Sequence, residues 1–483
     1  MESESIQTTV TSPPYWGLRD YKSKGQIGNE KTSDKFIEKL VKIFMEVHRV
    51  TSKDGTFWLN IADTYRNKQL QGVPWRLALA LQEKGWRLRS DIIWSKPNPM
   101  PESCKDRPTR SHEYIFLFSK SSKYYYDIDA LRSIALFLLI IYHLGQSFTS
   151  LAPYILFVQN KKVTDGIWPF LNVMNTWRIP LVFLIAGIAL RLSFQKRTKL
   201  EILKERGKII ALPWIFGTLI FSTSSAFIAD KYYDYWFLDG VNEAILLAFE
   251  YNGLHLWFLI NLIIYCLLIV PVLNFFSKKN FFSTILNKPG GIFLFAIPIV
   301  AEGNFLNSQR FYTETYGDYY IEYANTDHGL LLGFLWFTIG IILTSQEDSF
   351  WESNKRNWRM HLIFAIGSYL YRLFNNFETG YALDNRLIAF ESFNFIFLFL
   401  GLAAVYLNKD SPQLTYYKTA AYPVYIVHLP VQMLVMYFFS GINIHPIIKF
   451  PIALFLICFL SLTIYHSIKN ISVLRPLFGL RNK

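Results

Sequence analysis

The residues with the clearest chemical potential lie in the stretch DALRSIALFLLIIYH, where an arginine and a histidine stand eleven positions apart. Eleven residues of α-helix turn through about 1100°, which is three turns plus roughly 20°, so Arg132 and His143 share one face. The rise is about 16 Å, around half of a ~30 Å hydrocarbon core. Ionisable groups inside a membrane helix are costly and usually functional. A neutral imidazole there could act as a general base, with Arg132 at the cytoplasmic rim. The alternatives are a hydrogen-bonded packing histidine and a snorkelling arginine.

A second stretch of this kind, QTTVTSPPYWGLRDY, begins at Gln7. Its centre is Ser12, Pro13, Pro14 and Tyr15. Proline fixes the backbone φ angle, so the hydroxyl and the nearby carbonyls can be held in place to bind the exocyclic amino group of a flipped base. The tyrosine could stack on that base. The alternative is an ordinary turn after a strand.

The composition places these two stretches in regions of different class. The chain has 483 residues, 52% of them hydrophobic, and the apolar residues concentrate after residue 131. The net charge of +13 fits nucleic-acid binding in a soluble protein and basic cytoplasmic loops in a membrane protein, so it does not discriminate between them. Cys104, Cys266 and Cys458 form no CxxC pair, which argues against a metal site or a disulfide framework. No signal peptide is predicted, because the first residues lack an apolar segment.

The elements that must position the two stretches follow from hydrophobic periodicity. In the first part, the alternation in TFWLNI and EYIFLFSK predicts buried strands, and LALALQEKGW predicts a helix that ends at Gly85. A membrane helix needs about 20 mostly apolar residues. The later part predicts ten such spans, the fifth being the weakest: 131–150, 179–194, 209–227, 254–275, 290–303, 328–344, 360–374, 387–407, 416–439 and 446–467.

The distribution of basic residues predicts how these spans are oriented. With the N-terminus in the cytoplasm, the inner loops and the C-terminal tail carry 18 Lys and Arg, whereas the outer loops carry 6. Cytoplasmic loops of membrane proteins are enriched in Lys and Arg. The asymmetry therefore predicts a multi-pass protein of the inner (cytoplasmic) membrane with both chain ends in the cytoplasm.

The Pro-Pro stretch is part of a longer pattern. It continues with GLRDY, GQIGNE, KDGTFWLNIADTY, GVPWRLALALQEKGWRLRSDIIWSKPNPMPES and DRPTRSHEYIFLFSKS. These residues resemble the amino-methylating DNA methyltransferases, N4-cytosine or N6-adenine, of the class whose catalytic motif precedes its cofactor motif. The resemblance implies a Rossmann-like α/β fold, DNA as partner and S-adenosylmethionine as cofactor, and Ser12 favours N4-cytosine. The family's glycine-rich FxGxG loop, whose backbone N–H groups approach the cofactor, does not occur after Ser121, so the resemblance covers a truncated fragment.

The Arg-x10-His pair also has companions later in the chain. They are RIPLVFLIAGIALR, HLWFLINLIIY and AAYPVYIVHLPV. Together they resemble the integral-membrane acyltransferase 3 family, whose members O-acylate sugars and glucans. In the first of these stretches the family more often has FLSG, and Ala186 stands at the serine position here. The resemblance covers the chain from about Tyr125 to its C-terminus.

The acyltransferase resemblance implies roles for individual residues. The phosphates of an acyl-CoA donor meet Arg132 and a basic loop, because guanidinium groups match phosphate oxygens. His143 takes the proton from a hydroxyl of a saccharide acceptor. The basic loop residues are Lys199, Lys204 and Arg206. The residues implied on the acceptor side are His255, Trp257, Tyr425 and His428, with interfacial packing as the alternative. Glu391 either orients a histidine or pairs with a nearby base, and the sequence does not choose.

The two resemblances predict a chain in two parts. A truncated DNA methyltransferase fragment occupies residues 1–128, and a mainly α-helical multi-pass acyltransferase occupies residues 129–483. The seam falls between about Tyr124 and Arg132, on a Tyr-Tyr-x-Asp pattern shared by both families, which suggests recombination at a short similarity or an assembly join. The predicted function is acyl transfer from acyl-CoA to an envelope saccharide or glucan. The alternatives are site-specific DNA (cytosine-N4) methylation with S-adenosylmethionine and a non-enzymatic membrane transporter.

Overall fold

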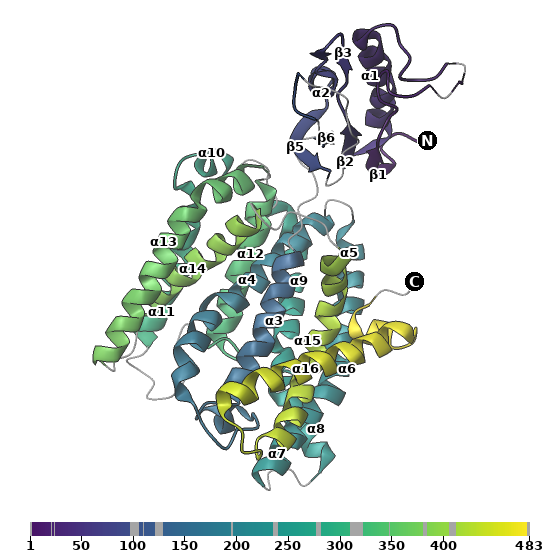
Figure 1. The fold of residues 1–483 in the computed structure, drawn as a ribbon. Coiled ribbons are helices and arrows are strands. Elements are labelled where there is room, and N and C mark those ends of the chain that lie inside the picture. Colours follow the sequence, from purple (N-terminus) through teal and green to yellow (C-terminus); the bar gives the residue numbers. More distant parts are fainter. Residues whose placement is uncertain are drawn as a thin grey trace. The chain divides into compact units, whose positions relative to one another are not determined.

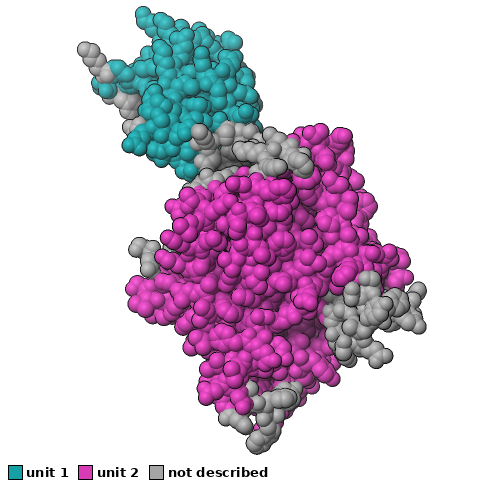
Figure 2. Space-filling model, turned by 180° about the vertical axis from the view of Figure 1, so that it is seen from behind, with its two compact units in different colours: residues 1–126 teal, residues 127–483 magenta. Residues whose placement is uncertain are grey.

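The computed structural model of the chain forms two compact units, Met1–Tyr126 and Asp127–Lys483 (Figure 2). Each unit is described separately below. Residues 121–128, which hold most of the predicted seam, and Cys104 lie outside the described residues. The structure describes residues 2–20, 22–23, 25–96, 106–109, 111–120, 129–194, 197–234, 240–276, 282–309, 322–346, 348–379, 384–404 and 412–480.

The first unit contains a four-stranded mixed sheet. Its strands are β1 (Ile6–Thr11), β2 (Thr51–Ile61), β5 (Arg87–Ser95) and β6 (His112–Ser119). They lie in the order β1-β2-β6-β5, with β1 parallel to β2 and the other two pairs antiparallel. A small hairpin of β3 (Tyr65–Arg66) and β4 (Gln69–Leu70) and the helices α1 (Ser33–Val50) and α2 (Val73–Glu83) complete the unit (Figure 1).

Two amphipathic helices cover one face of this sheet. Helix α1 is capped by Thr32, whose side chain accepts a hydrogen bond from the Lys35 N–H and satisfies one of the free donors of the first turn. Its buried residues include Phe36 and Phe44, which join alternate residues of β2 such as Phe57 in the core. Because successive residues of a strand point to opposite faces, this burial leaves the other residues of β2 on the second face. The predicted strands and the helix that ends before Gly85 are confirmed.

The second unit is built from helices (Figure 1). The first half contains α3 (Asp129–Gln146), α4 (Trp168–Phe194), α5 (Lys199–Arg206), α6 (Leu212–Gly217), α7 (Thr223–Tyr233), α8 (Val241–Glu250) and α9 (Trp257–Phe276). The second half contains α10 (Ser283–Leu286), α11 (Ala296–Gln309), α12 (Asp327–Ser345), α13 (Asp348–Thr379), α14 (Asn385–Leu402), α15 (Pro412–Phe439) and α16 (Pro446–Asn470).

Seven helical stretches of the described residues are long and apolar enough to cross a membrane. Two more, Leu131–Gln146 and Gly291–Asn307, are apolar but shorter. The predicted span 360–374 lies inside α13, which is not among the seven. The mainly helical, multi-pass character is therefore confirmed, whereas the count of about ten spans is not.

Small residues allow the longest helices of this unit to approach closely. A Cβ atom on Gly187 of α4 would lie 2.0 Å from the Phe337 carbonyl oxygen of α12, and one on Gly340 would lie 2.3 Å from the Leu184 oxygen. Glycine at such crossings lets helix backbones pack against one another where no hydrophobic effect drives association.

The predicted start of the second span at residue 179 is wrong for the helix, because α4 already begins at Trp168. Pro180 lies inside it.

Candidate active site

Two histidines from distant parts of the second unit form a direct contact. The Nδ1 atom of His143 in α3 lies 3.0 Å from the Nε2 atom of His428 in α15, and their rings stack with centroids 5.1 Å apart. Arg132 and His143 stand on one continuous helix, α3, as their spacing predicts. The structure therefore places two predicted site residues, 285 positions apart, in one hydrogen-bonded pair.

Backbone contacts fix the protonation pattern of this pair. The Nδ1 atom of His428 lies 2.7 Å from the Tyr425 carbonyl oxygen, which can only accept a hydrogen bond. Nδ1 of a neutral His428 therefore carries the hydrogen, and its Nε2 accepts one from Nδ1 of His143. This leaves the Nε2 of His143 as an unprotonated acceptor, which has no hydrogen-bond partner among the described residues and is not one of their fully buried polar atoms. His428 itself is completely buried.

A third histidine, His255, closes the cluster. Its ring centroid lies 5.3 Å from that of His428, and the Tyr425 hydroxyl donates to the His255 carbonyl oxygen at 2.7 Å. His255 is buried beside His428. It lies in the short 3-10 turn Leu254–Leu256, which follows α8 after a tight turn at Gly253. That glycine has φ +86°, and a Cβ there would lie 2.6 Å from the Thr218 hydroxyl.

The other residue predicted on the acceptor side, Trp257, lies apart from this hydrogen-bonded group. It is buried in the first turn of α9, and its ring packs beside Phe183 and Phe258 at centroid distances of 6.2 and 6.4 Å. Phe258 in turn contacts the Tyr425 ring at 6.4 Å. The contacts of Trp257 are aromatic packing, the alternative that the sequence left open.

Arg178 is a residue of the site that the sequence reasoning missed. The second predicted span begins only at residue 179, but Arg178 lies inside α4 and is 2% exposed. Its guanidinium group lies over the ring of Tyr142, the neighbour of His143 in sequence, 4.6 Å from the centroid. The signal that could have found it is its place in the quoted stretch RIPLVFLIAGIALR, directly before a proline and a long apolar run.

Three of the four predicted phosphate-binding residues lie on the short helix α5. Lys199 begins α5 and donates to the Pro271 carbonyl oxygen of α9 at 2.7 Å. Lys204 is exposed, and Arg206 is half-buried at the end of the same helix. Arg132 is partly buried near the start of α3, eleven residues before His143.

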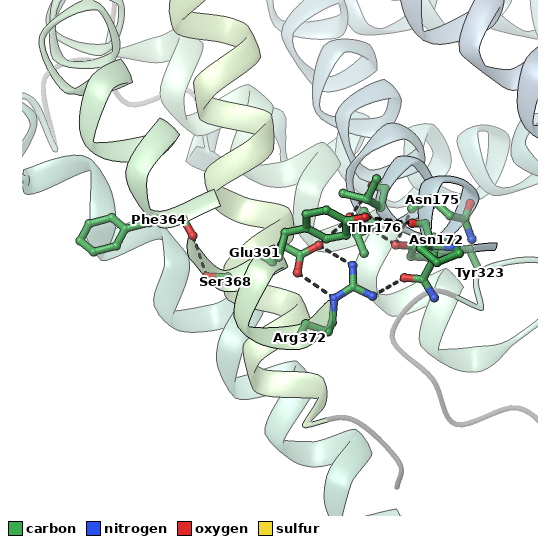
Figure 3. A network of polar contacts seen from close by, with 11 residues as sticks. Asn172, Asn175, Thr176, Tyr323, Phe364, Ser368, Arg372 and Glu391 are labelled. Atoms are coloured by element: carbon green, nitrogen blue, oxygen red, sulfur yellow. Dashed lines mark hydrogen bonds and ion pairs between the residues drawn. The ribbon is translucent and has the colours of Figure 1, made fainter. Parts of the chain in front are cut away.

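Glu391 belongs to a separate polar network in the helical unit (Figure 3). Arg372 of α13 donates to both carboxylate oxygens, at 2.8 Å from Nε and 2.6 Å from Nη2, and also to Asn172. Thr176 of α4 donates to the same carboxylate at 3.5 Å. Both charged side chains are almost completely buried. Of the two possibilities left open for Glu391, pairing with a base is the one observed.

In the first unit, the Pro-Pro stretch leads into a polar cluster around Glu113. The Tyr15 hydroxyl donates to the Glu113 carboxylate at 3.0 Å and lies 3.1 Å from the Ser12 hydroxyl. Asn60 donates to the same carboxylate at 3.0 Å, and Lys96 forms an ion pair with it. Burial and the neighbouring carboxylate raise the pKa of Tyr15 to about 12. Burial alone would raise the pKa of Glu113, but hydrogen bonds from Lys96, Asn60 and Tyr15 outweigh it and lower the pKa below its ordinary value.

The face of the sheet opposite α1 and α2 is hollow and apolar. Val10 and Trp94 are 74% and 49% exposed there. A depression of about 530 Å³ is lined by Val10, Thr11, Ser12, Trp58, Asn60, Ile92, Trp94 and Ile115. Both helices described in this unit pack on the other face, and no glycine-rich strand-to-helix turn occurs among its described residues. The described residues alone therefore do not fit S-adenosylmethionine.

Comparison with protein families decides the class of the helical unit. The family described as "Acyltransferase domain" (acyltransferase 3) matches residues 125–466, which is more than half of the chain. The chain belongs to this acyltransferase family. The predicted resemblance is confirmed, and the matched residues include the three histidines and Arg178. An acyltransferase of this class with its apolar helices is a membrane protein.

The N-terminal part of this acyltransferase matches a second family, described as "DNA methylase", over residues 6–177. Type II methyltransferase M.XycI of Xanthomonas campestris pv. cyanopsidis is 50% identical over 161 residues, which cover 27% of this chain and 54% of the relative. M.Cfr9I of Citrobacter freundii gives the same values, and M.SmaI of Serratia marcescens is 49% identical with 55% of the relative covered. The chain thus spans about half the length of the curated relatives it matches.

Solved structures give weaker similarities in the same region. The PvuII cytosine-N4-specific DNA methyltransferase is 20% identical, with a TM-score of 0.23 and coverage of 27% of this chain and 48% of that one. A putative DNA modification methylase of Thermus thermophilus in complex with S-adenosyl-L-methionine is 24% identical, with a TM-score of 0.22 and coverage of 28% and 56%. Scores this low do not establish a shared fold.

Proposed function

We propose that this protein is a membrane O-acyltransferase that moves an acyl group from acyl-CoA to a hydroxyl of an envelope saccharide or glucan. The observation that carries the proposal is the chain of contacts from the Tyr425 carbonyl through His428 to His143. It leaves Nε2 of His143 as an acceptor without a hydrogen-bond partner among the described residues, in the tautomer that these contacts imply. A general base held by a second group in this way is the arrangement that acyl transfer to a hydroxyl needs.

The proposed reaction uses His143 first as a base and then as an acid. Its Nε2 takes the acceptor O–H proton while the acceptor oxygen forms a bond to the thioester carbonyl carbon, and the C=O electron pair moves onto the carbonyl oxygen. When that pair returns, the C–S bond breaks. The imidazolium then gives its proton to the leaving thiolate, which releases CoA as a thiol. His428 keeps the His143 ring in one orientation and one tautomer throughout.

The donor is proposed to enter from the cytoplasmic side. Arg132, Lys199, Lys204 and Arg206 would hold its phosphates, since Arg and Lys are the usual phosphate ligands. The rise of about 16 Å from Arg132 to His143 along α3 is a length that an extended pantetheine arm can span. This proposal includes location in the inner membrane, with both chain ends in the cytoplasm, because the basic residues favour that orientation. His255 and Tyr425 would border the acceptor.

The test is an acyl-transfer assay with the purified full-length chain in detergent, radiolabelled acetyl-CoA and a gluco-oligosaccharide acceptor. Wild type transfers label, and His143→Ala loses transfer while its helical content is retained. Full activity in His143→Ala would reject His143 as the base. Flux of a solute through reconstituted vesicles without acyl turnover would instead favour a transporter.

A second proposal concerns the N-terminal part, which is similar to DNA methyltransferases. We propose that residues 1–128 form a separate domain from residues 129–483 and do not methylate DNA alone. The support is the uncovered sheet face and the coverage of only 54% of the relatives, which leave no described residues to hold the cofactor. Isothermal titration of the full chain with S-adenosylmethionine tests this. Saturable binding would show that the N-terminal part is a functional methyltransferase half.

A further inference from the structure

Within the part of the chain that the structure describes, the guanidinium group of Arg178 is a buried charge without a charged partner. Its Nη2 donates to the Asn175 side-chain oxygen at 3.1 Å, and the Tyr142 ring lies beneath it. Both of these partners are neutral, and the fully buried Nε has no hydrogen-bond partner among the described residues. Among the described residues no carboxylate lies within ion-pair distance of it. A buried ion without a counter-charge destabilises a fold, so its presence needs another explanation.

Two other buried arginines of the same unit show what a structural arginine looks like here. Arg372 is neutralised by Glu391 through two hydrogen bonds. Arg191, near the C-terminal end of α4, donates its Nε to the Ser345 hydroxyl at 2.8 Å. In both of these arginines the Nε–H donates a hydrogen bond, whereas the Nε–H of Arg178 has no acceptor among the described residues. This difference indicates that the Nε–H of Arg178 binds a ligand.

Its position relative to the histidines indicates which ligand. The Tyr142 ring under Arg178 is 6.0 Å from the ring of His143, which directly follows Tyr142 in α3. The turn of α4 that precedes it is anchored by the Tyr323 hydroxyl, which donates to the carbonyl oxygens of Asn175 and Thr176. The cation therefore lies against the residue that directly precedes the proposed base.

We propose that Arg178 is a catalytic residue that binds the thioester carbonyl oxygen of the acyl donor as it becomes negatively charged. The inference rests on the proposed acyl transfer. In the attack step the acceptor proton goes to Nε2 of His143, the new C–O bond forms, and the displaced electron pair lies on the oxygen facing Nε of Arg178. When the C–S bond breaks, that oxygen becomes the carbonyl oxygen of the product ester and the interaction weakens.

The proposed step brings two positive charges into one buried site, where like charges repel. When the oxyanion forms, its negative charge lies between two positive groups, Arg178 and the newly protonated His143. Donors aimed at a charge that develops only in the transition state accelerate the reaction without tightening substrate binding.

The experiment compares Arg178→Gln and Arg178→Lys with Arg191→Gln, a matched buried arginine of the same helix. The purified full chain in detergent receives acetyl-CoA and a gluco-oligosaccharide, and thiol release and Tm are measured. We expect Arg178→Gln to lose about 10²–10³-fold in kcat, the range for an oxyanion donor, with KM for acetyl-CoA within about threefold. Its Tm stays equal or rises because an unpaired buried charge is removed. Arg178→Lys recovers part of kcat, whereas Arg191→Gln lowers Tm and leaves kcat per folded molecule unchanged.

Two results would overturn this role. One is wild-type kcat in Arg178→Gln. The other is a loss of activity in Arg178→Gln that is matched by a loss of Tm like that of Arg191→Gln, which would make Arg178 structural. A wild-type chain that releases no thiol rejects the proposed function itself, and with it this role. Turnover in wild type that Arg178→Gln retains rejects the role of Arg178 alone.

Discussion

The two units of this chain differ in how completely their polar clusters are covered by other elements. In the first unit, the cluster around Glu113 lies beside a depression on an open sheet face, where apolar residues such as Trp94 remain exposed. In the second unit, the ion pair of Arg372 with Glu391 and the three-histidine cluster are enclosed by helices. The described part of the first unit therefore leaves one face of its sheet uncovered, whereas the helices of the second unit bury its polar groups.

The lengths of the matched relatives agree with this difference. The acyltransferase family matches residues 125–466, which is almost all of the second unit. The methyltransferase relatives extend to about twice the matched part. Single substitutions at a site that lies wholly inside the second unit should change acyl transfer. Substitutions in the first unit, which matches only about half of its relatives, should not change it. The four predictions below test that contrast from the largest expected effect to the smallest.

The largest effect is expected from His143→Ala in the second unit. Acyl transfer should fall by about 10²–10⁴-fold, the usual contribution of a general base. The matched change in the first unit, Ser12→Ala, should leave acyl transfer unchanged because Ser12 belongs to the other unit. Label transfer to the saccharide measures both variants. A loss of acyl transfer in Ser12→Ala would show that the activity of the second unit depends on the first unit.

The buried ion pair should give the next largest effect. Glu391→Gln leaves the Arg372 charge uncompensated and should cost about 3–5 kcal/mol of unfolding free energy. The double variant Arg372→Met with Glu391→Leu should recover most of this, because it replaces the pair by apolar groups. Denaturation of the full chain in detergent measures the difference. Equal stabilities of the single and double variants would show that the pair is not coupled.

Within the first unit, the two faces of the sheet should differ strongly. Leu59→Ala on the covered face should cost about 2–5 kcal/mol, because it opens a cavity in the core. Val10→Ala on the open face should change stability by no more than about 0.5 kcal/mol, because Val10 is mostly exposed. Hydrogen exchange of peptides from β2 and β6 reports on this unit within the full chain. A large effect of Val10→Ala would mean that something covers the open face.

The smallest effect is a pH dependence that belongs to the first unit. The pKa of Glu113 is lowered in the folded state, so its stabilisation is present above the ordinary carboxyl pKa of 4.5 and is lost as the pH falls through the lowered value. The pKa of Tyr15 is raised from 10.0 to about 12, so its contribution is present below pH 10 and is lost as the pH rises toward 12.

Exchange protection of the β6 peptide should therefore be flat between about pH 5 and 9, after correction for the intrinsic exchange rate. Glu113→Gln should remove the decline on the acid side, and Tyr15→Phe should remove the decline on the alkaline side. An acid decline of the same size in Glu113→Gln would assign it to other carboxyl groups.

The sequence by itself determined several features that depend on local pattern. The alternation in TFWLNI fixed β2, the apolar periods fixed most of the membrane helices, and eleven-residue spacing placed Arg132 and His143 on one helix. The short quoted motifs were enough for both family resemblances. These features follow from periodicity and from residue types that lie close together in the chain.

Only the tertiary structure decided which side chains meet. The contact of His143 with His428 spans 285 residues, the partner of Glu391 is Arg372, and Arg178, which precedes the predicted second span, lies inside α4. Hydrophobic periodicity states that a helix is buried, but it does not state which of its neighbours faces each residue. That choice depends on helix crossings such as the close approach of α4 and α12 at Gly187, where packing of whole helices sets the geometry.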